Sequence, residues 1–196
     1  MSSIRSDTIG GFNTFLNDQR DEPGSATVSL VDFNSSVEIV YEGVDVKEAP
    51  ELSEDTYVPG GRTALHDAIS IAIKETAADI AARDPGNHLD NVIVVVLTDG
   101  KENASETPTD QIRNLVQAYR EEHDWEFLFI GANQDAALSA NKMAIDIDHS
   151  LDMAHSSEGT KAAYESTSER ISQARREGST GGFAEEDRDR QPDSDN

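Results

Sequence analysis

Six consecutive apolar residues, Val92–Leu97, lead directly into Thr98, Asp99 and Gly100. A valine-rich run of this length, without a polar face, predicts a β-strand buried on both faces, as in parallel sheets that are covered by helices. Ligands of such sheets bind at the carboxyl ends of the strands. Asp99 lies at such an end, so we expect the run to form the sheet interior and Asp99 to belong to a functional rim.

The rest of the chain alternates between strand-like and helix-like patterns. Asn34 and Ser35 are expected to join the first two strands as a hairpin, and Thr109 or Asp110 to cap a helix. This alternation predicts an α/β fold, with a mostly parallel central sheet, an antiparallel edge hairpin and helices on both faces. The expected helices are 6–20, 64–82, 109–119, 135–143 and 157–177, and the expected strands are 26–33, 36–44, 92–97, 125–132 and 150–153.

Charge is the most unusual property of the composition. The chain carries 39 acidic against 16 basic residues, a net charge of −23, and the excess is not confined to the C-terminal segment. Nucleic acid is excluded as a partner, because phosphate contacts need clustered lysine and arginine. The acidic side chains repel one another at this charge density, and salt is needed to screen the repulsion. We therefore expect a halophilic protein, such as one from a haloarchaeal cytoplasm, whose fold tightens as salt rises; an acidic mesophilic protein is the alternative.

Several classes of protein are excluded by what the sequence lacks. Without cysteine there is no disulfide framework, thiolate catalysis or cysteine-based zinc site. No apolar stretch approaches the roughly 18 residues of a membrane span, and the first residues do not resemble a signal peptide. We expect a cytoplasmic protein without a membrane partner.

The common catalytic motifs of α/β proteins are also missing. There is no G-x-G-x-x-G after a strand, no P-loop lysine after Gly60 and Gly61, and no G-x-S-x-G elbow. The five histidines do not have the spacing of metal ligands, and we expect His66 to be a surface residue of a helix.

Two segments remain, "PGGRTALHDA" and "VVVLTDGKENAS". They offer the hydroxyl of Thr63 and the carboxylate of Asp99 at neighbouring strand ends. Both are hard oxygen ligands, which suit Mg²⁺ or Mn²⁺ better than zinc.

In this order and at this spacing, the two segments resemble motifs of the von Willebrand factor A (VWA) domains, and "WEFLFIGANQDA" is similar to the strand and loop that follow in prokaryotic members. The resemblance covers about residues 4–150 and implies a Rossmann-like VWA fold. It also implies a metal-ion-dependent adhesion site (MIDAS), in which Thr63 is the metal-binding threonine and Asp99 the metal-site aspartate.

The resemblance gives expectations for the neighbours of this site as well. Thr98 and Gly100 would shape the turn around Asp99. Asp67 would be a solvated or capping carboxylate near the site. Asn103 and Ser105 would be hydrogen-bonding residues of the loop.

One part of the family pattern is absent, the Asp-x-Ser-x-Ser motif that follows the first strand. "DFNSS" at 32–36 has the wrong spacing and lies in the hairpin turn. The family's first strand is central, so its absence would leave strands 26–33 and 92–97 facing a gap. We therefore expect an N-terminally truncated chain in which Met1 is an internal methionine, preceded by the missing strand and motif.

These observations give the expected organisation: a VWA domain at 1–155 that lacks its usual first strand, a polar helix at 156–177 and a disordered acidic tail at 178–196. The resemblance implies a protein-interaction module that binds an Asp or Glu of a partner, such as an AAA-type ATPase, through Mg²⁺ at a site that is incomplete in this chain. A metal-free VWA scaffold is the alternative, followed by a metal-dependent hydrolase. No residue resembles a general base beside a nucleophile, so we do not expect an enzyme.

Overall fold

The computed structural model describes residues 4–84, 89–132 and 135–192. Helices and strands follow one another in the order that the sequence predicts, and their bounds differ from the expected ones by only a few residues. The helices are α1 Arg5–Asp21, α2 Leu65–Ala82, α3 Thr109–His123, α4 Ala136–Lys142, α5 Ser157–Glu177 and α6 Glu185–Asp189. The strands are β1 Thr27–Phe33, β2 Val37–Asp45, β3 Ile93–Thr98, β4 Glu126–Ala132 and β5 Ser150–Met153.

The strands form two separate sheets. β1 and β2 pair antiparallel as the expected hairpin, while β3, β4 and β5 pair parallel in that order. The mixed α/β class is therefore confirmed, whereas one continuous central sheet is not formed, because β1 and β3 do not pair. As expected for strands 26–33 and 92–97, β1 and β3 each have an edge that is not paired with any other strand in the described part of the chain.

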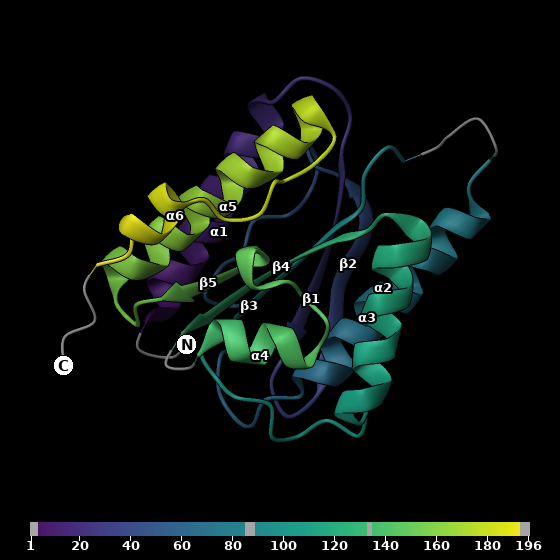
Figure 1. The fold of residues 1–196 in the computed structure, drawn as a ribbon. Helices are drawn as coiled ribbons and strands as arrows, with labels where there is room; N and C mark the ends of the chain where they lie inside the picture. Colours follow the sequence, from purple (N-terminus) through teal and green to yellow (C-terminus); the bar gives the residue numbers. More distant parts are fainter. Residues whose placement is uncertain (1–3, 85–88, 133–134, 193–196) are drawn as a thin grey trace.

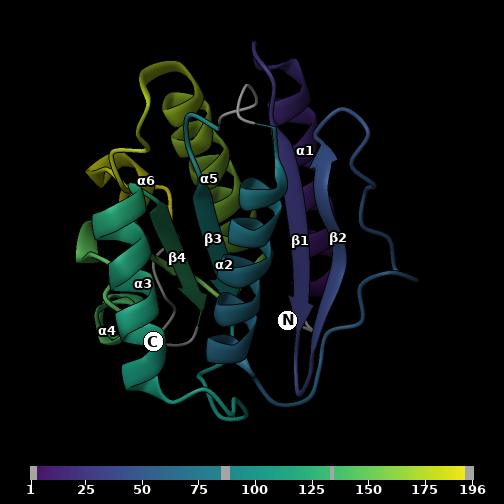
Figure 2. The ribbon, with the colours of Figure 1, turned by 90° about the vertical axis from the view of Figure 1, so that its right-hand side faces the viewer.

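Helices cover both sides of the strands. Figure 2 shows α2 and α3 in front of the sheets and α1 and α5 behind them. The front layer packs on one core cluster, which includes Ile69 and Ile73 of α2, Ile112 and Val116 of α3, and Phe127 of β4. Because Leu128 and Ile130 of β4 belong to a cluster on the opposite face, β4 is buried on both sides.

The interpretation of β3 as a strand buried on both faces is wrong. Val96 is buried, but Val95 is 37% exposed. An apolar run shows that a strand can be buried, yet its actual burial depends on neighbours on both of its edges. Among the described strands, β3 has a neighbour on one edge alone.

The expected polar helix at 156–177 packs closely against the first helix (Figure 1). α5 buries mainly small residues, among them Ala163, Ser166 and Thr167. A Cβ atom added to Gly11 of α1 would overlap the ring of Tyr164 on α5. Glycine at this position thus permits the close approach of the two helices.

The expectation of a disordered tail at 178–196 is wrong for residues 178–192. Phe183 is 4% exposed and belongs to the cluster formed by β4 and β5. The Arg188 guanidinium donates a 2.7 Å hydrogen bond to the carbonyl of Ser150, and Asp187 is buried beside Arg170. A single well-placed aromatic residue and its polar neighbours therefore anchor a segment whose composition resembles that of disordered chains.

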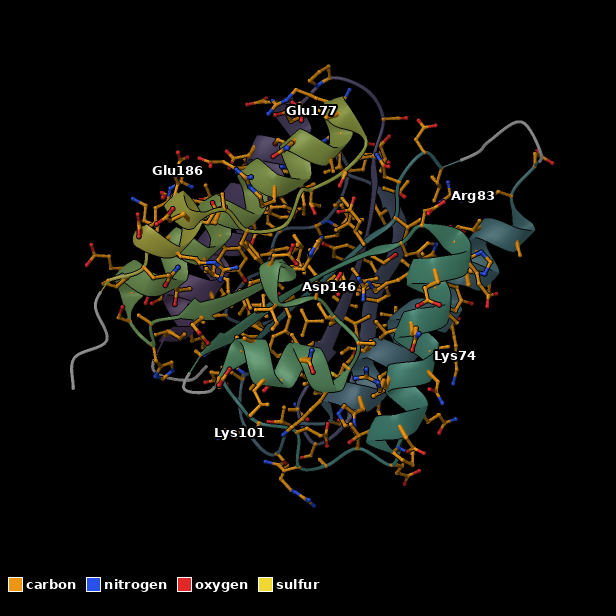
Figure 3. All side chains as sticks on the ribbon, in the orientation of Figure 1. Lys74, Arg83, Lys101, Asp146, Glu177 and Glu186 are labelled. Atoms are coloured by element: carbon orange, nitrogen blue, oxygen red, sulfur yellow. The ribbon has the colours of Figure 1, made fainter. Side chains whose placement is uncertain are left out.

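α3 begins directly after Pro108, and neither Thr109 nor Asp110 caps it through a side chain, contrary to expectation. Acidic side chains such as Glu177 and Glu186 lie on the outer surface (Figure 3). Within the described residues, none of the helices combines the length and apolar character that crossing a membrane requires.

Candidate metal site at the rim of the sheets

Three segments meet beyond the carboxyl ends of β1 and β3: the hairpin turn 34–36, the approach to α2 at 60–64, and the loop 99–107. We call them together the rim. The first two are joined by hydrogen bonds from Ala64 N to Asn34 O, at 2.8 Å, and from Arg62 N to the Ser35 hydroxyl, at 2.9 Å. The "DFNSS" segment therefore helps to position the loop that carries Thr63.

Thr63 is fixed by its backbone to the loop that follows β3. Its N–H donates a 2.9 Å hydrogen bond to Oδ1 of Asn103. Its carbonyl accepts hydrogen bonds from the backbone N–H groups of Asn103, at 3.0 Å, and Ala104, at 3.2 Å. The prediction that Asn103 is a hydrogen-bonding residue of the loop is confirmed.

The Thr63 hydroxyl lies directly against the turn that contains Asp99. A Cβ atom added to Gly100 would overlap Oγ1 of Thr63, so only glycine allows this approach. Thr98 closes the turn, because its hydroxyl accepts a 3.2 Å hydrogen bond from Gly100 N and donates a 3.1 Å bond to Gly100 O. Thr98 and Gly100 thus shape the turn as predicted, and the structure brings Thr63 beside the residue that follows Asp99.

His155 contacts the rim through Asp99, although the sequence did not single it out. Its Nε2 lies 3.5 Å from Oδ2 of Asp99, and both side chains are about three-quarters buried. His155 comes two residues after β5, and parallel strands β3 and β5 end at the same edge of their sheet. Its position after a predicted strand was the signal that could have identified it.

Glu102 organises the loop from within. Its carboxylate accepts hydrogen bonds from the N–H groups of His66, Ala104 and Ser105 at 2.8–3.0 Å, and from the Ser105 hydroxyl at 2.7 Å. Burial raises the pKa of Glu102, but these hydrogen bonds outweigh burial, so the pKa lies below its ordinary value. The predicted loop role of Ser105 is confirmed.

Asp67 caps no helix, contrary to one of the two roles expected for it, and its carboxylate instead binds the backbone of the loop that follows β3. It accepts hydrogen bonds of 2.9 Å from the backbone N–H groups of Glu106 and Thr107. Burial acts to raise the pKa of Asp67, and the bonds from Thr107 and Glu106 reverse this effect and lower it. Asp67 therefore holds the end of the loop against α2.

The expectation that His66 is a surface residue is wrong. It is 7% exposed, and its Nδ1 lies 3.1 Å from the carbonyl oxygen of Thr107. Helical periodicity places His66 at the start of α2, but the loop 102–107 folds over this first turn and covers the ring.

The oxygen atoms of Thr63 and Asp99 suit a hard cation. Mg²⁺ in proteins usually keeps several waters and takes one or two carboxylates, so a hydroxyl and a carboxylate could form part of its ligand set. Their role as metal ligands stays a prediction. Among the described residues, only Asp146, Asp148 and His149 form a cluster of three acidic or histidine ligands. That cluster lies elsewhere, and Asp146 pairs with Arg120.

The comparisons with known proteins agree with this architecture. The family model described as the von Willebrand factor type A domain matches residues 6–170. Neither the curated proteins nor the solved structures contained a match to the chain. VWA domains generally act as protein-interaction modules. The match spans most of the chain and includes both rim motifs, and we conclude that the chain belongs to the von Willebrand factor type A domain family.

Proposed function

We propose that this VWA domain binds a partner protein through a Mg²⁺ ion at the rim, with the Thr63 hydroxyl and the Asp99 carboxylate as protein ligands. The partner would contribute an Asp or Glu side chain, and an AAA-type ATPase is the class that the family resemblance suggests. One observation carries the proposal: Gly100 leaves room for the Thr63 hydroxyl directly beside the Asp99 turn.

The chain's own residues would hold the two protein ligands in fixed positions, and the partner would supply a further ligand. Asn103 holds the backbone of Thr63, and Glu102 and Asp67 hold the loop through backbone N–H groups. Such fixed ligands reduce the ordering cost of binding. The ion would supply, when bound, a positive charge that a carboxylate of the partner can approach. This is a binding role without a catalytic step.

Isothermal titration calorimetry with MgCl₂ tests the proposal on the full chain. We expect saturable binding by the wild type, and a loss of affinity of about tenfold or more in Thr63→Ala and Asp99→Asn, because each removes a ligand. Thr109→Ala and Asp110→Asn, at exposed positions of α3, are matched controls and should bind like the wild type. Absence of Mg²⁺ binding in the wild type, or full binding by Asp99→Asn, would contradict the metal-bridge proposal.

A metal-free scaffold is the second candidate, and the contact between His155 and Asp99 favours it. A domain in which His155 holds the Asp99 carboxylate would bind its partner through surface contacts alone. For this candidate the same titration should give no heat of binding. The variant His155→Gln separates the two candidates further. Under the metal proposal His155→Gln still binds Mg²⁺, whereas under the scaffold proposal it binds no Mg²⁺, like the wild type.

A further inference from the structure

α1 and α5 lie side by side on one side of the strands, and serine hydroxyls of α5 bond to carboxylates of α1 (Figure 1). The Ser157 hydroxyl donates a 2.6 Å hydrogen bond to Oδ1 of Asp7, and the Ser168 hydroxyl donates a 2.9 Å bond to Oδ2 of Asp18. In both pairs the residues are 150 positions apart, so the two helices run parallel. These bonds hold the two helices in a fixed register.

The outer surface between these helices contains a groove with a volume of about 260 Å³, which we call the α1/α5 groove. A single water needs only about 10–15 Å³, so the α1/α5 groove has room for side chains of another molecule. The buried Phe12 and Leu16 of α1 do not line it, so it faces away from the strands. Its lining includes Ser6, Gly10 and Thr14 of α1 and Ser157, Lys161 and Glu165 of α5.

Gly10 is the residue of this groove that packing within the described chain does not explain. It lies inside α1, where glycine is less favourable than alanine by about 0.5–1 kcal/mol. The Tyr164 ring requires glycine at Gly11, but a Cβ atom at Gly10 would have no described atom within 4 Å. Glycine on the surface of a helix permits the backbone of another element to approach closely. Gly10 therefore points to a neighbour that packs on this part of α1.

The α1/α5 groove is acidic. Three carboxylates line it, those of Asp7, Asp18 and Glu165, and among the described lining residues Lys161 is the only cation. The Lys161 ammonium lies 3.7 Å from the Glu165 carboxylate. The bonds that Asp7 and Asp18 accept at the groove come from serine hydroxyls, which carry no charge and do not neutralise these carboxylates. A partner surface with positive charges is therefore complementary to the groove.

The spacing of the two aspartates sets the geometry of a complementary helix. Asp7 and Asp18 are eleven residues apart, close to three helical turns, so they lie on one face of α1 about 16.5 Å apart. The small residues Gly10 and Thr14 lie between them and are exposed. A helix that lies along the groove has the same spacing on its own surface, with basic residues eleven positions apart and apolar side chains between them.

We propose that the α1/α5 groove binds an amphipathic helix of a partner protein, with two arginine or lysine residues eleven positions apart and apolar side chains between them. The basic residues would pair with Asp7 and Asp18, and the backbone of the partner helix would lie against Gly10. A second copy of the chain is disfavoured as the occupant, because each copy carries a net charge of −23. This proposal goes beyond the metal-dependent function, because it uses neither Thr63 nor Asp99.

The test uses the full chain in EDTA, where the metal bridge is absent. The probe is a fluorescein-labelled, alanine-based helical peptide with two arginines eleven positions apart and two leucines between them on the same face. The control peptide has the same composition, but its arginines are nine positions apart and therefore lie on opposite faces of the helix. Because both peptides carry the same charge, non-specific attraction to the acidic chain is the same for both. We expect saturable binding of the probe in fluorescence anisotropy, and binding of the control peptide that is weaker by about tenfold or more.

Variants of the protein provide the matching test. Gly10→Ala should weaken binding of the probe by about tenfold through overpacking against the peptide backbone, while urea denaturation shows that the variant is folded. Asp18→Asn should weaken binding by about threefold to tenfold. Asp21→Asn removes the same charge at the exposed end of α1, outside the groove, and should bind like the wild type. The proposal is overturned by absence of saturable binding, by equal binding of the two peptides, by full binding of the probe to Gly10→Ala, or by a wild-type dimer that Gly10→Ala dissociates.

Discussion

Oδ1 of Asn103 accepts a 2.9 Å hydrogen bond from the backbone N–H of Thr63, 40 positions earlier in the chain. This bond orients the loop that presents the Thr63 hydroxyl to the Asp99 turn. Residues that position metal ligands typically contribute about tenfold to a hundredfold to metal affinity. We therefore expect Asn103→Ala to weaken Mg²⁺ binding in this range, measured by calorimetry.

A control separates this effect from a general loss of stability. Asn114→Ala changes an exposed asparagine of α3 and should leave the Mg²⁺ affinity unchanged. If Asn103→Ala binds Mg²⁺ as tightly as Asn114→Ala does, then the orientation of Thr63 is not important for the site.

Adjacent glycines of α1 should respond in opposite directions to the same substitution. A Cβ atom at Gly11 would overlap the Tyr164 ring, whereas a Cβ atom at Gly10 has no neighbour within 4 Å. Gly11→Ala should destabilise the protein by about 1–3 kcal/mol through overpacking. Gly10→Ala should stabilise it by about 0.5–1 kcal/mol, because alanine is the better helix former. Urea denaturation measures both; equal effects would show that α1 does not pack on α5 at this distance.

Phe183 should anchor the C-terminal segment 178–192. It is buried in the cluster of β4 and β5, so Phe183→Ala should cost about 3–5 kcal/mol of unfolding free energy. Glu186→Ala, on the outer surface of α6 (Figure 3), is the control and should change stability by less than about 0.5 kcal/mol. Equal melting temperatures of Phe183→Ala and Glu186→Ala would indicate that residues 178–192 are disordered.

The sequence predicts the positions of the strands well, but it predicts their burial and the contacts at the candidate site less well. Hydrophobic periodicity located every strand, because it depends on the local chain alone. The burial of β3 could not be predicted in this way, since the exposure of Val95 depends on which elements pack against β3 in the folded chain. Residues 178–192 are ordered because a single residue, Phe183, is buried in the cluster of β4 and β5, and the sequence alone does not show this contact. For the candidate site, the motifs predict Thr63 and Asp99 as metal ligands, which stays a prediction. The contacts of Glu102 and His155 could not be predicted, because they depend on how distant loops fold together.

His149 lies between two carboxylates, which influence its ionisation. Its Nε2 is 3.7 Å from Oε2 of Glu126, and its Nδ1 is 3.1 Å from Oδ1 of Asp148. The neighbouring carboxylate of Glu126 is the main cause that raises the pKa of His149; burial opposes this effect, and Asp148 supports it. The pKa values of both carboxyl groups are lowered, so they are ionised when His149 titrates.

A raised pKa in the folded state means that protonation of His149 stabilises the fold. This contribution is complete below the ordinary histidine pKa of about 6.5 and is lost as the pH rises through the raised value. We expect the melting temperature of the wild type to exceed that of His149→Gln by the largest amount near pH 6 and by progressively less at higher pH. Proton NMR of the His149 ring should give a pKa above the ordinary value. A difference in melting temperature that grows from pH 6 upward would contradict the assigned ion pairs.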